Sequence, residues 1–248
     1  MRHAIPLLLS TLTACTIYTP LQPPAPDIQA KGQMQAGLGV RMSTHVEGSA
    51  VYAPLNHVMV RVAGGGTPLP ASGPTLKFAS GQIEGGLGTY WPLGQHWLAG
   101  GLGGLAAGRS RLHYPQSAEL EDYRARFRRS YGEVYLHHYI SPYVALGTSY
   151  RLNQVRYSTF TNAGLPTTVR SVVRSEPLLF VRAGDDLRTE AGAIQAQLSV
   201  GLSMAHGPRE RLMDDIILDL PMHRAKFSTF YTTLSVVIRP HLLRRKAQ

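Results

Sequence analysis

The feature that most constrains the fold of this chain is an alternation of apolar and small or polar residues along much of its length. Between residues 194 and 204 every second residue is apolar, and Gln, Ser and Gly occupy the positions between them. Segments 36–42 and 144–152 show the same alternation. An amphipathic helix repeats its apolar residues every three or four positions, whereas a strand changes face at every residue. The pattern therefore predicts strands with one apolar and one small polar face.

The sequence predicts about ten strands between residues 31 and 240, with eight as the lower bound. A proline within the eighth, Pro177, removes a ladder donor and predicts a bulge or a break there. The expected strands span 32–43, 46–53, 57–63, 78–90, 97–113, 128–140, 144–160, 171–182, 193–206 and 225–238.

Short and long connections alternate between these strands. The short ones span 54–56, 92–96, 141–143 and 183–190, and the long ones span 64–77, 114–127, 161–170 and 206–224. Outer-membrane barrels combine tight periplasmic turns with longer outside loops. We therefore expect an all-β fold, an antiparallel up-and-down transmembrane β-barrel, with the short turns in the periplasm.

Composition agrees with a barrel whose outer face does not meet water. Charged residues make up only 16% of the chain, and 25 of its 248 residues are glycine. Four charged residues, Arg41, Glu84, Glu133 and Arg151, fall on the inward parity of their strands, where we expect them to form ion pairs. Side chains fill a barrel of this size, so the expected lumen is narrow or plugged.

The first fifteen residues have the order of a bacterial export signal. A basic start and a short apolar run lead to Leu12-Thr13-Ala14-Cys15, which resembles the lipobox of bacterial lipoproteins. That resemblance implies a signal peptide over 1–14 and lipidation of Cys15. The apolar run is too short to span a bilayer. Since Cys15 is the only cysteine, no disulfide framework is expected.

Residues 15–30 hold four prolines and are expected to form an extended, solvated linker behind the lipid anchor. Neither an Asp nor an acidic cluster follows Cys15, which favours the periplasmic side of the outer membrane for the anchor. The basic tail, 241–248, together with Arg239, is expected at the periplasmic leaflet, either against phosphate headgroups or as a plain solvated tail.

One stretch resembles a known group of proteins. The sequence QAGLGVRMSTHVEGSAVYAPLNHVMVRVAG, residues 35–64, is similar to the opening of Bacteroidetes-type outer-membrane β-barrel lipoproteins. The lipobox, the proline-rich linker and the turn at 52–57 carry the similarity. It implies a lipid-anchored barrel and supplies no activity.

Aromatic and basic side chains gather near several turns. Aromatic residues flanking short turns are expected to form a membrane-interface girdle, with ordinary sheet packing as the alternative. These are Tyr90, Trp91, Trp97, Tyr139 and Tyr143. A basic run is expected on the outer side, either as a solvated loop or against anionic lipopolysaccharide. It comprises Arg124, Arg126, Arg128 and Arg129.

Two long loops carry apolar residues at helical spacing, over 120–127 and 212–220. Each is expected to be either a short helix that caps the barrel mouth or a disordered loop.

No catalytic, cofactor or metal site is predicted. The Gly-rich stretch 101–106 loosely fits a dinucleotide motif but lies inside a strand, and no G-x-S-x-G occurs. His137 and His138 are adjacent, so on a strand they face opposite sides and cannot chelate one metal. Asp pairs at 185–186 and 214–215 are weak metal candidates. Export and the lack of a motif argue against nucleic acid.

The leading hypothesis is an outer-membrane β-barrel lipoprotein with a structural, binding or assembly role and no enzymatic activity. Its expected partners are outer-membrane lipids, with lipopolysaccharide as a candidate, and the barrel-assembly and lipoprotein-sorting machinery. One alternative is a tethered soluble barrel like a lipocalin, with its apolar faces turned inward to hold a ligand. The other is a lipid-modifying enzyme with a Ser, a His and an acid near one rim.

Overall fold

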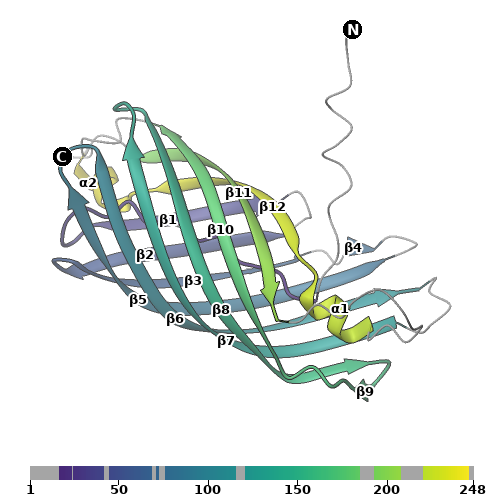
Figure 1. Cartoon of the computed structure of the whole chain (residues 1–248). Coiled ribbons are helices and arrows are strands. Elements are labelled where there is room, and N and C mark those ends of the chain that lie inside the picture. Colours follow the sequence, from purple (N-terminus) through teal and green to yellow (C-terminus); the bar gives the residue numbers. More distant parts are fainter. Residues whose placement is uncertain are drawn as a thin grey trace, which may run out of the picture.

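Ten long strands form one antiparallel sheet that closes on itself in the computed structural model (Figure 1). The structure describes residues 17–23, 25–41, 45–68, 71–72, 76–115, 121–184, 193–207 and 220–245. The ten strands are β1 (Met34–Arg41), β2 (Val46–Leu55), β3 (Val58–Gly66), β5 (Lys77–Leu93), β6 (Trp97–Tyr114), β7 (Glu121–Tyr139), β8 (Val144–Asn162), β10 (Ser171–Gly184), β11 (Ile194–His206) and β12 (Thr229–Ile238). The short elements are β4 (Ala71–Ser72), β9 (Leu165–Pro166), α1 (Leu220–Lys226) and α2 (Pro240–Arg245).

The sheet closes where the first strand pairs with the last. Ala36 lies opposite Ile238, and the β1–β12 ladder continues to Arg41 opposite Thr233. Every other long strand pairs with its neighbours in sequence, which is up-and-down topology. Closure leaves none of the ten long strands at an open sheet edge, so the wall pairs its own backbone. The prediction of a ten-stranded antiparallel barrel is confirmed.

The two ends of the barrel differ in the length of their connections. At one end, which we call the turn end, strands are joined by connections such as 56–57, 94–96 and 140–143. At the other, the loop end, lie the connections 67–76, 115–120, 163–170 and 207–228, and the short first connection, 42–45. Figure 1 shows α2 at the turn end and α1 at the loop end. None of the described helices is long and apolar enough to cross a bilayer.

The two faces of the wall have opposite character. On β11 the outward apolar residues from Ile194 to Met204 are exposed, while Gln195, Gln197 and Ser199 between them are buried. Ten residue steps at about 3.3 Å, tilted by about 45°, give a band roughly 23 Å tall. That height matches the apolar band of about 25 Å that transmembrane barrels present to lipid.

Inward glycines on β6 face aromatic rings on β7. Tyr135 lies directly opposite Gly100, and Phe127 directly opposite Gly108. A Cβ atom at Gly108 would lie 2.5 Å from Cζ of Phe127, closer than real Cβ contacts allow. The high glycine content therefore makes room for large rings inside a narrow lumen.

Two local expectations need correction. Pro177 does not break its strand: β10 keeps a constant register, and only its ladder with β11 is interrupted, at Glu176 and Pro177. The helical spacing over 120–127 was misleading, because β7 begins at Glu121 and Tyr123 and Phe127 both point into the lumen. Alternation with outward arginines explains that spacing equally well. Of the second stretch, 212–220, only its last residue is described, and it begins α1.

Candidate functional site

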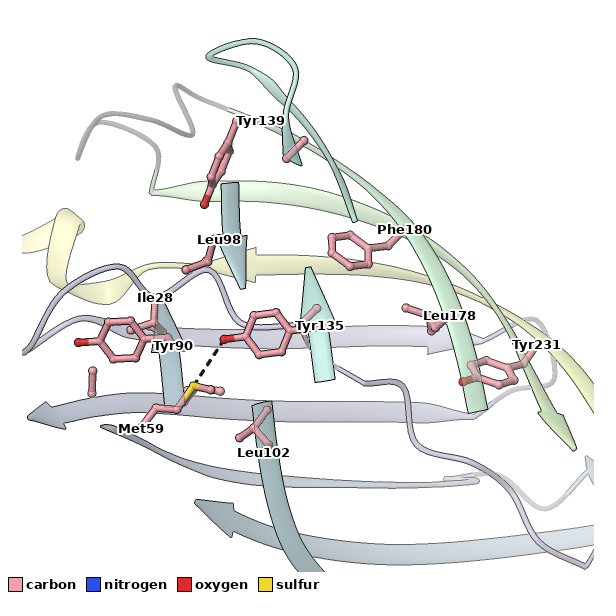
Figure 2. Close-up of a cluster of buried hydrophobic side chains, with 14 residues drawn as sticks. Ile28, Met59, Tyr90, Leu98, Leu102, Tyr135, Tyr139, Leu178, Phe180 and Tyr231 are labelled. Carbon is pink, nitrogen blue, oxygen red and sulfur yellow. Dashed lines mark hydrogen bonds between the residues drawn. The ribbon is translucent and has the colours of Figure 1, made fainter. Parts of the chain in front are cut away.

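The lumen is filled by the chain's own N-terminal residues. This plug segment, residues 17–23 and 25–33, precedes β1 and runs along the inside of the barrel. Ile17 packs in an apolar cluster with Tyr123 and Phe160 near the loop end. Ile28 packs in another, with Met59 and Tyr90, near the turn end. Figure 2 shows Ile28 among the inward rings of that second cluster.

The plug segment hydrogen-bonds to strands all around the wall. The wall side chains lie at different heights along the barrel axis, and their contacts follow the plug segment from the loop end to the turn end. The backbone carbonyls accept from Ser110 Oγ (Ile17, 2.5 Å), Gln82 Nε2 (Thr19, 2.6 Å), Arg41 Nη2 (Pro20, 2.9 Å), Arg151 Nη1 (Leu21, 3.3 Å) and Arg182 Nη2 (Ala25, 3.2 Å).

The expectation that residues 15–30 form a solvated linker is wrong for the described part, 17–23 and 25–30, most of which is buried. Proline explains why this sequence suits a lumen. An extended segment makes no hydrogen bonds within itself, and each proline removes one N–H that would need a buried acceptor. The remaining carbonyls are acceptors, and the inward arginines supply charged donors for them.

Two polar side chains fix the plug segment at its ends. The Tyr18 hydroxyl accepts from Arg129 Nη1 at 2.6 Å and donates to Glu176 Oε1 at 3.0 Å. Near the turn end, Asp27 contacts Arg239 and accepts from the Tyr139 hydroxyl. Burial opposes ionisation of Asp27, but Arg239 and the other nearby donors outweigh it and lower the pKa of this carboxyl. Both ends are therefore held by buried charged partners.

The plug segment ends in a tight turn at the turn end. Gly32 has a φ of +82°, a left-handed conformation that glycine adopts without strain. Its N–H donates to the Ala53 carbonyl at 2.8 Å, and Ala53 N–H donates to Gln33 at 3.0 Å. This turn reverses the chain from the lumen into β1.

Five buried charged residues on β3, β5, β7 and β8 form a cluster inside the barrel. Arg151 Nη2 lies 2.7 Å and Arg61 Nη1 lies 3.3 Å from Glu133 Oε2. Glu84 contacts Arg61 and Arg129, and lies 3.5 Å from Arg151. The expected internal ion pairs of Glu84, Glu133 and Arg151 are confirmed.

The other charged residues are best sorted by which side of the wall they face. Arg41 pairs with Glu47 at 3.5 Å, as an inward residue should. Arg61 was missed, although its odd position on β3 is the signal that places it inside. Arg129 is buried in the lumen, so its assignment to the outer side with its three neighbours was wrong. Arg239, expected at lipid headgroups, also points inward, to Asp27.

The loop end is closed in part by α1. Arg174 Nη1 donates to the Ala225 carbonyl at 2.9 Å, and Arg174 Nη2 donates to the Phe227 carbonyl at 2.8 Å. Arg224 Nη2 lies 3.1 Å from Glu121 Oε2 on β7. These contacts tie α1 and the residue after it to β7 and β10, which flank β8 on one side of the mouth.

At the turn end, the expected aromatic girdle is present in part. Trp91, Trp97 and Tyr143 point outward, with exposed fractions of 49%, 42% and 61%. Tyr90 and Tyr139 do not belong to it, because alternation turns them into the lumen, where both are buried. His138 packs against the outward ring of Trp97 while His137 is buried, which confirms that the two histidines face opposite sides.

The expected anchor, Cys15, lies outside the described residues. The description begins at Ile17, which lies near the loop end, far along the barrel from the short turns. The expectation that the anchor shares the periplasmic side with the short turns concerns Cys15 and stays a prediction.

Two alternatives to the outer-membrane barrel are a lipocalin-like soluble barrel and a lipid-modifying enzyme. The lipocalin-like arrangement is contradicted, because the apolar strand faces point outward and the inward faces are polar. Among the described residues, a Ser–His contact lies at the loop end, where His45 Nδ1 is 3.5 Å from Ser80 Oγ. Burial and the charge of Arg41 lower the pKa of His45 to about 4. A hydrolytic triad needs a carboxylate beside the imidazole, not an arginine.

Within the described ranges, no group of three metal-ligating side chains occurs. The Asp pairs at 185–186 and 214–215 lie outside those ranges.

No family model and no curated protein matches this sequence, so the Bacteroidetes resemblance stays a prediction. Among solved structures, the translocator domain of autotransporter NalP from Neisseria meningitidis aligns at 9% identity with a TM-score of 0.44, covering 84% of this chain and 85% of that one. The NanC porin aligns at 9% identity with a TM-score of 0.36, covering 83% of this chain and 98% of the porin. A bacterial polysaccharide outer membrane secretin aligns at 9% identity with a TM-score of 0.24, covering 86% of this chain and 99% of the secretin.

The strand pairing of the chain itself defines its class: a closed ten-stranded up-and-down β-barrel whose lumen holds its own N-terminal segment.

Proposed function

We propose that this protein is a sealed outer-membrane β-barrel lipoprotein with a structural, binding or assembly role and no enzymatic activity. The observation that carries the proposal is the pairing of a lipid-compatible outside with a filled inside. Exposed apolar residues surround the wall, and exposed aromatic rings mark its turn end. A porin needs an open lumen, whereas here the plug segment occupies it.

The first test combines fractionation, gel migration and conductance. The protein should be found in isolated outer membranes, migrate faster unboiled than boiled, and leave planar bilayers silent. A variant that lacks residues 19–28 but still shows heat-modifiable migration should conduct. If wild-type protein and the deletion variant conduct equally, the lumen is not sealed by this segment. Wild-type protein that is soluble once its tether is cut contradicts the membrane placement.

The lipid anchor forms the second part of the proposal. Acylation of Cys15 should appear as incorporation of an alkyne-bearing fatty acid, and Cys15→Ser should abolish it. Because Ile17 lies near the loop end, we place the anchor on the same side as the long loops, which is the outer leaflet for a conventionally inserted barrel.

Sidedness is tested with single cysteines added to the chain. Leu165→Cys lies in the loop-end extension and is exposed, and Gln95→Cys lies in a turn-end connection and is exposed. A membrane-impermeant maleimide applied to intact cells should label Leu165→Cys only. Labelling of Gln95→Cys alone would mean that the barrel is inserted in the opposite orientation, with the anchor on the periplasmic side. Both variants should react equally after the membranes are solubilised.

A further inference from the structure

Six arginines form a cationic face on the outside of the barrel, near the loop end. They lie on the neighbouring strands β6, β7 and β8 and point away from the lumen, because they alternate with buried residues. The side chains of Arg111 and Arg124 are 55% and 60% exposed. The arginine face comprises Arg109, Arg111, Arg124, Arg126, Arg128 and Arg156.

The strand register brings these like charges directly together. The three pairs opposite each other are Arg109 with Arg126, Arg111 with Arg124, and Arg128 with Arg156. Like charges at opposed positions destabilise a sheet. Asp122 lies 3.1 Å from Arg111 and 3.0 Å from Arg124. For the other four, no carboxylate among the described residues lies within 4.0 Å. The fold itself gains nothing from this arrangement.

The charge is confined to one side of the barrel. The outward positions of β11, β12, β1, β2 and β3 that the structure describes hold no lysine or arginine. A face meant only for solubility would be spread around the rim, with both signs of charge. Concentration on three adjacent strands instead indicates one anionic partner.

The height of the arginine face identifies that partner as a lipid. Going toward the loop end, the outward residues of β8 are Leu152, Gln154 and Arg156. On β7, Ser130 lies opposite Gln154 and Arg128 lies opposite Arg156. Apolar, neutral polar and cationic positions thus follow one another. Acyl chains, their ester or amide groups and the phosphates of a lipid follow the same order.

We propose that the arginine face binds the phosphate groups of lipopolysaccharide in the outer leaflet. A guanidinium offers a planar pair of donors that matches phosphate oxygens. Successive outward arginines on β7 lie about 6.6 Å apart along the strand, which gives three cationic rows. Three rows fit a headgroup with more than one phosphate better than a lipid with one. This proposal rests on the outer-membrane placement proposed above.

The test uses the purified full-length protein in detergent, with native mass spectrometry to count bound lipid. Bisphosphorylated lipid A should remain bound, and the doubly dephosphorylated lipid should not. Arg126→Gln combined with Arg128→Gln should weaken binding about tenfold or more, and Lys at both positions should weaken it less, since charge remains but the paired donors do not. Lys31→Gln, an exposed charge at the turn end, is the control and should change nothing.

The outcomes separate the sources of phosphate and the two proposals. Equal binding of phosphorylated and dephosphorylated lipid, or an unaffected double variant, overturns the proposal. Displacement by millimolar inorganic phosphate as effective as by lipid A identifies a soluble anion as the ligand and also overturns it. Heat-modifiable migration of every variant shows that the barrel is folded. Loss of that migration in the wild type would instead contradict the barrel proposal, independently of lipid binding.

Discussion

The two faces of β7 show how one strand serves two environments. Its inward residues are large and polar or aromatic, such as Arg129, Glu133 and Tyr135, and they contact the plug segment or other strands. Its outward residues within the apolar band are small or apolar, such as Gly132 and Val134. The inside therefore depends on specific partners, and the outside depends on chemical character alone. Substitutions should consequently be judged by face before they are judged by residue type.

Removing a buried carboxylate should have the largest effect on this contrast. Glu84 contacts Arg61, Arg129 and Arg151, all fully buried. In Glu84→Gln, Arg61 and Arg151 keep Glu133 as a carboxylate partner. Arg129 keeps its neutral partners Tyr18 and Asn153, and we expect a loss of about 3–5 kcal/mol. Urea unfolding of the barrel, followed by loss of the fast-migrating unboiled band, measures it.

The matched control for Glu84→Gln is Asp122→Asn on the outside. Asp122 also contacts two arginines, but those side chains are more than half exposed. Water and salt screen such pairs, so the expected loss is about 0–1 kcal/mol. Equal losses at the two positions would mean that the lumen cluster is not sealed from water.

A charge placed on the outer face of the apolar band should have the next largest effect. Leu198 is outward and exposed near the middle of β11. Arginine at the bilayer midplane costs about 2–4 kcal/mol in a transmembrane barrel, so Leu198→Arg should impair assembly. The amount of heat-modifiable protein in isolated outer membranes measures this. Leu165→Arg, the same change in the 73% exposed loop-end extension, should assemble normally.

Ser199, the inward neighbour of Leu198, is not a neutral control for Leu198→Arg. Alternation alone predicts that Ser199→Arg, on the polar face, is better tolerated than Leu198→Arg. In the structure Ser199 is fully buried, and its Oγ accepts from Gln22 Nε2 of the plug segment at 2.6 Å. We therefore expect Ser199→Arg to disrupt packing of the plug segment as well. Normal assembly of both arginine variants would contradict the assignment of both faces.

The sequence predicts the wall well because parity is local. The alternation over 194–204 is enough to assign each side chain of β11 to a face, and the same rule places Glu84, Glu133 and Arg151 inside. Other patterns misplace residues that parity places correctly. The basic run predicts Arg129 on the outer side, and position beside short turns predicts Tyr90 and Tyr139 in the girdle. In each case the odd or even position along the strand contained the answer.

The plug segment could not be predicted in this way, because its position depends on contacts with residues far away in the sequence. Tyr18 meets Glu176 across 158 positions, and Gln22 meets Ser199 across 177. Prolines and the preceding cysteine are equally compatible with a solvated tether. One signal was present: a solvated linker gains nothing from apolar Ile17 and Ile28, whereas the lumen gives both of them apolar neighbours.

The smallest expected effect distinguishes the two faces by a single methyl group. In Gly108→Ala, the new methyl points into the lumen and meets the Phe127 ring at 2.5 Å, and overpacking of this kind costs about 1–3 kcal/mol. In Gly132→Ala on the neighbouring strand, the methyl points outward and meets nothing within 4 Å. Alanine also restricts the unfolded chain more than glycine, so Gly132→Ala should be as stable as the wild type or about 0.4–1 kcal/mol more stable. Urea unfolding of both variants under one condition tests the pair. Gly108→Ala at wild-type stability would mean that Phe127 yields freely, and the lumen is then not packed tightly enough to hold the plug segment by shape.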